Sequence, residues 1–142
     1  MTDILSKSEA ETAKAAQDLA AELNVPQIIL LNGNLGMGKT VFARALIRAL
    51  TNEPNLEVVS PTFTLLQTYE TDEAPIYHYD LYRIENSDEI LELGWEESIA
   101  EGITIVEWPE RLSAYKPAQY LDITLSNSDN DPDHRKIQIQ KV

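Results

Sequence analysis

A glycine-rich segment at residues 33–40 constrains the fold of this chain more than any other feature. Its sequence, GNLGMGKT, fits the pattern G-x-x-x-x-G-K-[ST] at every fixed position. The apolar run at 28–31 predicts a buried strand just before it, and apolar residues at helical spacing over 41–49 predict a helix just after it. This is the strand–loop–helix context that a phosphate-binding loop requires.

Such a loop binds phosphate through its backbone. Successive N–H groups, unobstructed by side chains at the glycines, form a concave site for an anion, and the helix N-terminus adds its partial positive charge. Lys39 is expected to reach the β- and γ-phosphates of a nucleotide, and the Thr40 hydroxyl to join the ligands of Mg²⁺. The alternative is a glycine-rich turn that matches by chance, which at average glycine usage occurs in roughly one chain of several hundred. The segment therefore predicts nucleotide binding.

The composition limits the classes of protein to which the chain can belong. Its 142 residues are enough for a moderate core, and we expect a single domain over 1–142. With 24 acidic and 11 basic residues the formal net charge is −13, which disfavours autonomous binding to nucleic acid, so a role near RNA needs a more basic partner. The chain has no cysteine, which excludes disulfides and cysteine zinc sites. Its two histidines, His78 and His134, are too few and too far apart in sequence to suggest a histidine metal site.

No part of the sequence indicates export or a membrane. The first residues lack the apolar core of a signal peptide, and no stretch approaches the roughly 20 apolar residues that cross a bilayer. We therefore expect a cytoplasmic protein without a membrane partner.

Apolar periodicity and turn residues predict the order of the elements. Helices are expected at 8–24, 39–50, 86–94 and 95–100, and strands at 27–32, 58–60, 63–70, 76–81, 102–107, 121–125 and 136–142, with a polar turn at 126–133. The solidly apolar strand at 27–32 is typical of a parallel, fully buried strand, whereas the last two strands alternate and are typical of half-exposed antiparallel strands. The predicted fold is α/β, a three-layer fold like that of P-loop NTPases, with a mixed sheet and antiparallel C-terminal strands.

Two acidic residues end apolar strands, where a carboxylate near Mg²⁺ is expected. Asp80 follows Ile76–Tyr79, and Glu107 follows Ile103–Val106. The alternative for each is an ordinary acidic residue at the start of a loop. We favour Glu107 as a direct or water-mediated metal ligand, and expect Asp80 to hold metal-bound water or to orient the attacking water.

Three further features have a structural and a functional interpretation. Ser60–Phe63 lies where a switch segment would sense the γ-phosphate, but a proline turn entering a strand is the better explanation from composition alone. Arg83 is suited either to neutralising phosphate charge or to a surface salt bridge. Trp108 is suited to covering a nucleotide, to contacting a partner, or simply to filling a loop.

Four segments in order resemble one family: GNLGMGKT at 33–40, SPTFTL at 60–65, HYDLYR at 78–83 and VEWPE at 106–110. Together they are similar to the bacterial TsaE (YjeE-type) ATPases, and the resemblance spans about residues 8–140. The loop of that family usually reads G-D-L-G-A-G-K-T-T. This chain has Asn34, Met37 and Val41 where the family has Asp, Ala and a second Thr, but it keeps the lysine and the first threonine.

The resemblance implies an ATPase that supports formation of threonylcarbamoyladenosine at position 37 of tRNA. Proteins of this kind bind the TsaD–TsaB complex, which performs the transfer, and contact tRNA only through these partners. Lys39, Asp80 and Glu107 would then be catalytic, and Thr40 and Glu107 would hold Mg²⁺. The ATP-binding residues would be Leu35, Gly36, Met37, Gly38, Lys39, Thr40, Val41 and, near the base, Arg135.

Other nucleotide-dependent functions remain open from sequence. A small-molecule kinase of the P-loop class is the main alternative, although the chain has no compact arginine-rich stretch to form a lid. A GTPase is less suitable because no Asn-Lys-x-Asp segment exists to read guanine. A third alternative is a switch subunit that binds ATP without hydrolysing it.

Overall fold

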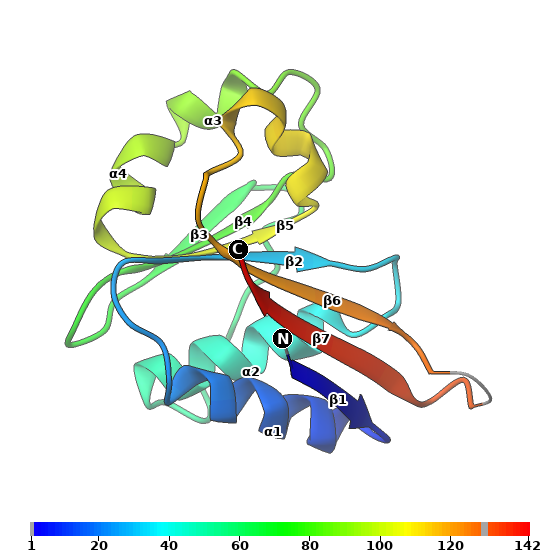
Figure 1. Ribbon diagram of the computed structural model, residues 1–142. Coiled ribbons are helices and arrows are strands. Elements are labelled where there is room, and N and C mark those ends of the chain that lie inside the picture. The colour runs from blue at the N-terminus through cyan, green and yellow to red at the C-terminus, as the bar shows by residue number, and fades with distance from the viewer. Residues whose placement is uncertain (1, 129–130) are drawn as a thin grey trace.

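The computed structural model describes residues 2–128 and 131–142, and it consists of one sheet between two helical layers (Figure 1). The elements are, in chain order, β1 Thr2–Ser6, α1 Glu9–Ala20, β2 Gln27–Asn32, α2 Lys39–Thr51, β3 Leu66–Tyr69, β4 Ile76–Asp80, α3 Glu89–Glu92, α4 Trp95–Glu101, β5 Ile103–Glu107, the 3-10 helix η1 Pro109–Tyr115, β6 Leu121–Asn127 and β7 Arg135–Lys141. Helices α1 and α2 cover one face of the sheet, and α3, α4 and η1 cover the other. The three-layer α/β fold is confirmed.

The seven strands lie in the order β1-β7-β6-β2-β5-β4-β3. The central strands β6, β2, β5 and β4 are mutually parallel, whereas β3, β7 and β1 join the two sides in antiparallel pairing. All five residues of β5 are buried, as expected for a strand covered on both faces. Because the four central strands run the same way, their carboxyl ends meet at one edge of the sheet.

The sheet separates two apolar cores, and alternate residues of β2 contribute to each. Ile29 and Leu31 pack with Phe42 of α2 in the larger core. Leu30 faces the other way and packs with Trp95 in the second core, beneath α4. Both cores therefore hold β2 rigidly in the centre of the sheet, directly before the glycine-rich loop.

Several predicted elements are wrong in extent or in kind. Residues 58–60 form no strand, and only Leu66–Tyr69 of the predicted strand at 63–70 pairs with β4. The first helix ends at Ala20 instead of residue 24, and the helix predicted at 86–94 is a single turn. Residues 126–127 belong to β6 rather than to the predicted polar turn, of which residues 129–130 lie outside the described part of the chain.

Two elements have no counterpart in the sequence prediction. Strand β1 is half polar and mostly exposed, and it exists because its backbone pairs with β7, from Thr2 opposite Ile139 to Ser6 opposite Arg135. The 3-10 helix η1 begins at Pro109 and closes the second core with Leu112, which is fully buried. Neither element has enough apolar periodicity to predict it locally.

No helix in residues 2–128 or 131–142 is long and apolar enough to cross a bilayer.

The two phenylalanines of the chain occupy opposite environments and provide a matched test of the larger core. Phe42 is fully buried, whereas Phe63 is 80% exposed. We expect Phe42→Ala to lower the free energy of unfolding by about 3–5 kcal/mol because it leaves a cavity between α2 and the sheet. Phe63→Ala should lower it by less than about 1 kcal/mol. Urea unfolding monitored by circular dichroism measures the free energy of unfolding of both variants. An equal loss of stability in the two would contradict the assigned core.

Candidate functional site

The glycine-rich loop connects the carboxyl end of β2 to the N-terminus of α2, at the edge of the sheet where the parallel strands end. Gly33 has a φ of +146°, and a Cβ there would lie 2.6 Å from the backbone oxygen of Leu125. Gly38 has a φ of +99° and is the N-cap residue of α2, without a side-chain capping hydrogen bond. Glycine is therefore required by close packing at one end of the loop and by a left-handed backbone at the other. The first N–H groups of α2 are left without a side-chain cap, the arrangement that receives an anion.

Lys39, the first residue of α2, has a buried side chain whose Nζ has no hydrogen-bond partner in the described part of the chain. Nζ lies 3.6 Å from the ring centroid of Trp108. Burial lowers the pKa of Lys39, while the nearby carboxylates of Glu107, Glu110 and Asp80 act in the opposite direction. A buried ammonium group without a hydrogen-bond acceptor costs free energy, and an anionic ligand at the loop would offset this cost.

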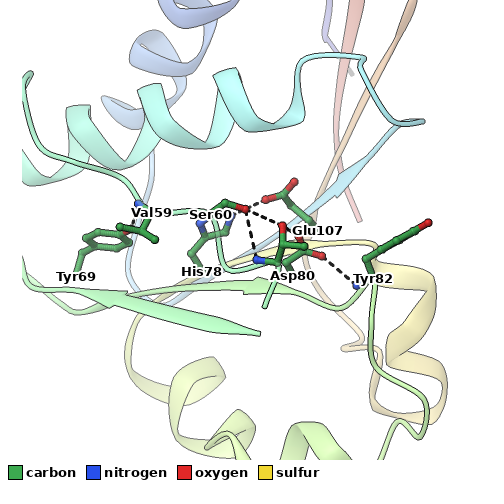
Figure 2. A network of polar contacts seen from close by, with 8 residues as sticks. Val59, Ser60, Tyr69, His78, Asp80, Tyr82 and Glu107 are labelled. Atoms are coloured by element: carbon green, nitrogen blue, oxygen red, sulfur yellow. Dashed lines mark hydrogen bonds and ion pairs between the residues drawn. The ribbon is translucent and has the colours of Figure 1, made fainter. Parts of the chain in front are cut away.

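Asp80 and Glu107, predicted from strand ends, are brought side by side. They lie opposite each other in the register of the parallel strands β4 and β5, and each is only 6% exposed. Asp80 Oδ1 accepts a hydrogen bond from the backbone N–H of Tyr82 at 3.0 Å, and Oδ2 accepts one from the Thr62 hydroxyl at 3.2 Å. These two donors fix the orientation of the Asp80 carboxylate (Figure 2).

Glu107 is held by a residue that the sequence analysis did not assign to the site. His78 Nε2 lies 2.7 Å from Glu107 Oε2, and both side chains are buried. The two histidines were judged too few and too far apart to bind a metal, and His78 otherwise entered only as part of the family-like segment at 78–83, without a role of its own. The spacing of His78 two residues before Asp80, which places both on the same face of β4, was the signal that could have identified it.

The segment at 58–65 contacts Asp80 and is both a turn and part of the site. The Ser60 and Thr62 hydroxyl oxygens are 2.7 Å apart, and Thr62 in turn donates to Asp80. The N–H of Leu65 donates to the carbonyl of Pro61 at 2.7 Å, which closes the turn. The hydroxyl chain from Ser60 to Asp80 therefore couples the position of this segment to a carboxylate of the site (Figure 2).

Two pockets flank the glycine-rich loop. One, of about 400 Å³, is lined by Lys39, Trp108, Glu110 and residues of β2 and β6. The other, of about 370 Å³, lies between the loop and the junction of β1 with α1; its lining residues are Lys7, Ser8, Glu9, Thr12, Gly36, Gly38, Val41, Asp133 and Arg135. The contribution of residues 7–12 to this region was not predicted, because Ser8, whose side chain caps α1 by accepting from the Glu11 N–H, indicates only a helix start.

Arg135, which the resemblance implies to be near the base of the nucleotide, lies beside the glycine-rich loop. Its Nη2 donates to the carbonyl oxygen of Gly36 at 3.2 Å, across 99 residues of sequence. Arg83 instead lies over the exposed ring of Phe63, with its guanidinium carbon 4.4 Å from the ring centroid. Trp108 packs on the ring of Tyr82 with 4.9 Å between centroids, in addition to its contact with Lys39.

Sequence and structure comparisons agree on the relatives of this chain. Residues 6–137 match the family model of the threonylcarbamoyl adenosine biosynthesis protein TsaE. The chain is 44% identical over 124 residues to the tRNA threonylcarbamoyladenosine biosynthesis protein TsaE of Rickettsia bellii, covering 87% of this chain and 85% of the relative. It is 40% identical over 141 residues to the TsaE protein of Aquifex aeolicus, covering 99% and 97%.

The fold comparison extends this similarity to a solved structure. The crystal structure of Bacillus subtilis YdiB has a TM-score of 0.77 and 26% sequence identity to this chain, covering 97% of this chain and 83% of the other. The similarity includes the central sheet and both helical layers, since it spans nearly the whole of the described structure. The chain belongs to the TsaE family of threonylcarbamoyladenosine biosynthesis proteins.

Proposed function

We propose that this protein binds ATP with Mg²⁺ and hydrolyses it to support the TsaD–TsaB complex in forming threonylcarbamoyladenosine at position 37 of tRNA. Family membership assigns the chain to threonylcarbamoyladenosine biosynthesis. The observation that carries the ATPase proposal is the buried Lys39 ammonium, which lies at the glycine-rich loop among the acidic side chains of Asp80, Glu107 and Glu110. We treat residues 1–142 as one ATPase domain that acts in the cytoplasm.

In this proposal the loop holds the phosphates. The backbone of the loop and the N-terminus of α2 surround the phosphates. The residues that take part are Leu35, Gly36, Met37, Gly38, Lys39, Thr40 and Val41. The Lys39 Nζ, which has no hydrogen-bond acceptor among the described residues, supplies the positive charge. Arg135 supports the loop through Gly36 and lines the adjacent pocket, which is suited to the rest of the nucleotide.

The acidic residues fit Mg²⁺ bound mainly through a nucleotide. In residues 2–128 and 131–142 no group of three or more histidine or acidic side chains forms a metal cage. Mg²⁺ typically keeps several waters and takes one or two protein ligands in addition to phosphate oxygens. Thr40 and Glu107 are the residues that would hold it, and bound Mg²⁺ would neutralise charge that develops on the phosphates.

Asp80 is suited to orienting the attacking water. Its carboxylate accepts one hydrogen bond from a backbone N–H and one from Thr62, which leaves lone pairs on both oxygens. Thr62 belongs to the segment at 58–65, so a change at the γ-phosphate can reach this segment through Asp80. Such a coupling would let partner binding and hydrolysis affect each other.

The composition supports action through partners. A net charge of −13 opposes direct contact with tRNA and favours docking on a more basic protein surface. A small-molecule kinase is the main alternative, and a switch subunit that only binds ATP is the second. The three functions differ in how phosphate release responds to added molecules. The partner complex accelerates it for the ATPase, a kinase requires an acceptor molecule, and a switch subunit releases no phosphate.

The first test is ATP turnover with and without TsaD–TsaB. We expect slow phosphate release by the purified protein and a marked acceleration when the complex is added, because the partner completes the site. Phosphate release at background level even with the partners would contradict the ATPase assignment. Release that requires an added small-molecule acceptor would indicate a kinase instead.

Lys39→Ala tests the phosphate-binding loop. We expect a loss of at least about 100-fold in turnover, because the main positive charge at the phosphates is removed. The fold should remain intact, since removing a buried ammonium also removes its desolvation cost. Phosphate release measures turnover, isothermal titration with ATP and Mg²⁺ measures affinity, and a thermal melt measures the stability of the fold. Lys14→Ala, on the exposed face of α1, is the control. Unchanged ATP affinity and turnover in Lys39→Ala would be incompatible with the proposed site.

The two carboxylates should have separable effects. Glu107→Ala should weaken the dependence of ATP binding on Mg²⁺ and reduce turnover, whereas Asp80→Ala should reduce turnover about 100-fold or more with little change in ATP affinity. Glu97→Ala, an exposed acidic residue on α4, is the control. Full turnover in both site variants would show that the carboxylate assignments are wrong.

A further inference from the structure

His78 is buried at a position where the pattern of β4 would place an apolar residue. Ile76, His78 and Asp80 alternate along β4 toward the α2 side, and Ile76 packs in the larger core. His78 is only 3% exposed, and its Nδ1 has no hydrogen-bond partner in the described part of the chain. A leucine would fill this position without leaving a buried nitrogen unsatisfied, so core stability does not explain the imidazole.

The hydrogen bond that His78 makes is directed at Glu107. Nε2 lies 2.7 Å from Glu107 Oε2. Within the described residues this is the only hydrogen bond to the Glu107 side chain. A carboxylate that binds Mg²⁺ is ionised and can only accept hydrogen bonds, so a Glu107 metal ligand requires that His78 Nε2 carry the hydrogen and act as the donor. The bond occupies one oxygen of Glu107 and leaves Oε1 free to bind a cation.

We propose that His78 is a positioning residue, whose Nε2–H holds Glu107 in the orientation that presents Oε1 to bound Mg²⁺. The proposal rests on the assignment of Glu107 as a metal ligand in the proposed function. Side chains that orient a metal-binding group typically contribute 10- to 100-fold to metal affinity or activity. His78 therefore acts on the metal through Glu107 and touches neither the nucleotide nor the reacting atoms.

Three substitutions separate the donated hydrogen bond from the volume of the ring. His78→Gln places an amide nitrogen at the same number of bonds from Cα as Nε2, and so can donate to Glu107. His78→Asn places its amide at the position of Nδ1, too short to reach Oε2. His78→Leu keeps an apolar volume and removes the donor. His134→Gln changes the other histidine of the chain, which pairs with Asp131, and is the matched control.

The primary measurement is the affinity for fluorescently labelled ATP as Mg²⁺ is titrated into protein in chelator. We expect His78→Leu and His78→Asn to raise the Mg²⁺ concentration at half-maximal effect by about 10-fold or more. Affinity without Mg²⁺ should be unchanged, and His78→Gln and His134→Gln should behave as the wild type. The proposal is overturned if the midpoint does not move in His78→Leu, if His78→Gln moves it equally, or if ATP binding is also lost without Mg²⁺.

A second measurement needs no variant of His78. In the His134→Gln protein a single imidazole remains, and nitrogen NMR reports which ring nitrogen is protonated. We expect a slowly exchanging proton on Nε2 that exchanges faster in Glu107→Ala. A proton on Nδ1 alone would overturn the proposal. If wild-type ATP binding does not respond to Mg²⁺, the metal assignment in the proposed function fails, and the NMR result still decides whether His78 holds Glu107.

Discussion

The parallel pairing of β5 with β2 on one side and with β4 on the other is the constraint on which the site depends. Glu107, the last residue of β5, lies opposite Leu31 of β2 and opposite Asp80 of β4. The glycine-rich loop begins two residues after Leu31, so this register places both carboxylates beside the loop. A shift of one residue would turn Asp80 or Glu107 to the other face of the sheet, because side chains alternate along a strand. The two cores on either side of β2 hold this register.

Charge at the site is arranged around a single buried ammonium. Lys39 lies near three carboxylates but hydrogen-bonds to none of them within the described residues, and its closest described partner is the ring of Trp108. The carboxylates of Asp80 and Glu107 are directed instead to His78, Thr62 and the backbone of Tyr82. In a chain with a net charge of −13, this arrangement leaves the Lys39 ammonium at the loop without a hydrogen bond to the acidic groups around it.

The parts predicted correctly from sequence are those whose signal is local. The strand at 27–32, the helix from Lys39 and the strand ending at Glu107 follow from continuous apolar runs bounded by glycine or charge. The strand predicted at 58–60 is absent, and the strand predicted at 63–70 begins only at Leu66 because a turn closed by the Leu65 N–H and the Pro61 carbonyl precedes it. Strand β1 was missed because its stability comes from pairing with β7, more than a hundred residues away.

The sequence by itself determined that a glycine-rich loop with the phosphate-loop motif follows a buried strand and that two strands end in acidic residues. Backbone conformation at the glycines, apolar periodicity and the charge at a strand end are local properties, and a local pattern encodes them. Only the tertiary structure decided which side chains meet: His78 with Glu107, Thr62 with Asp80, and Arg135 with Gly36. These contacts join elements distant in sequence, and the register of the sheet and the path of the loops determine them.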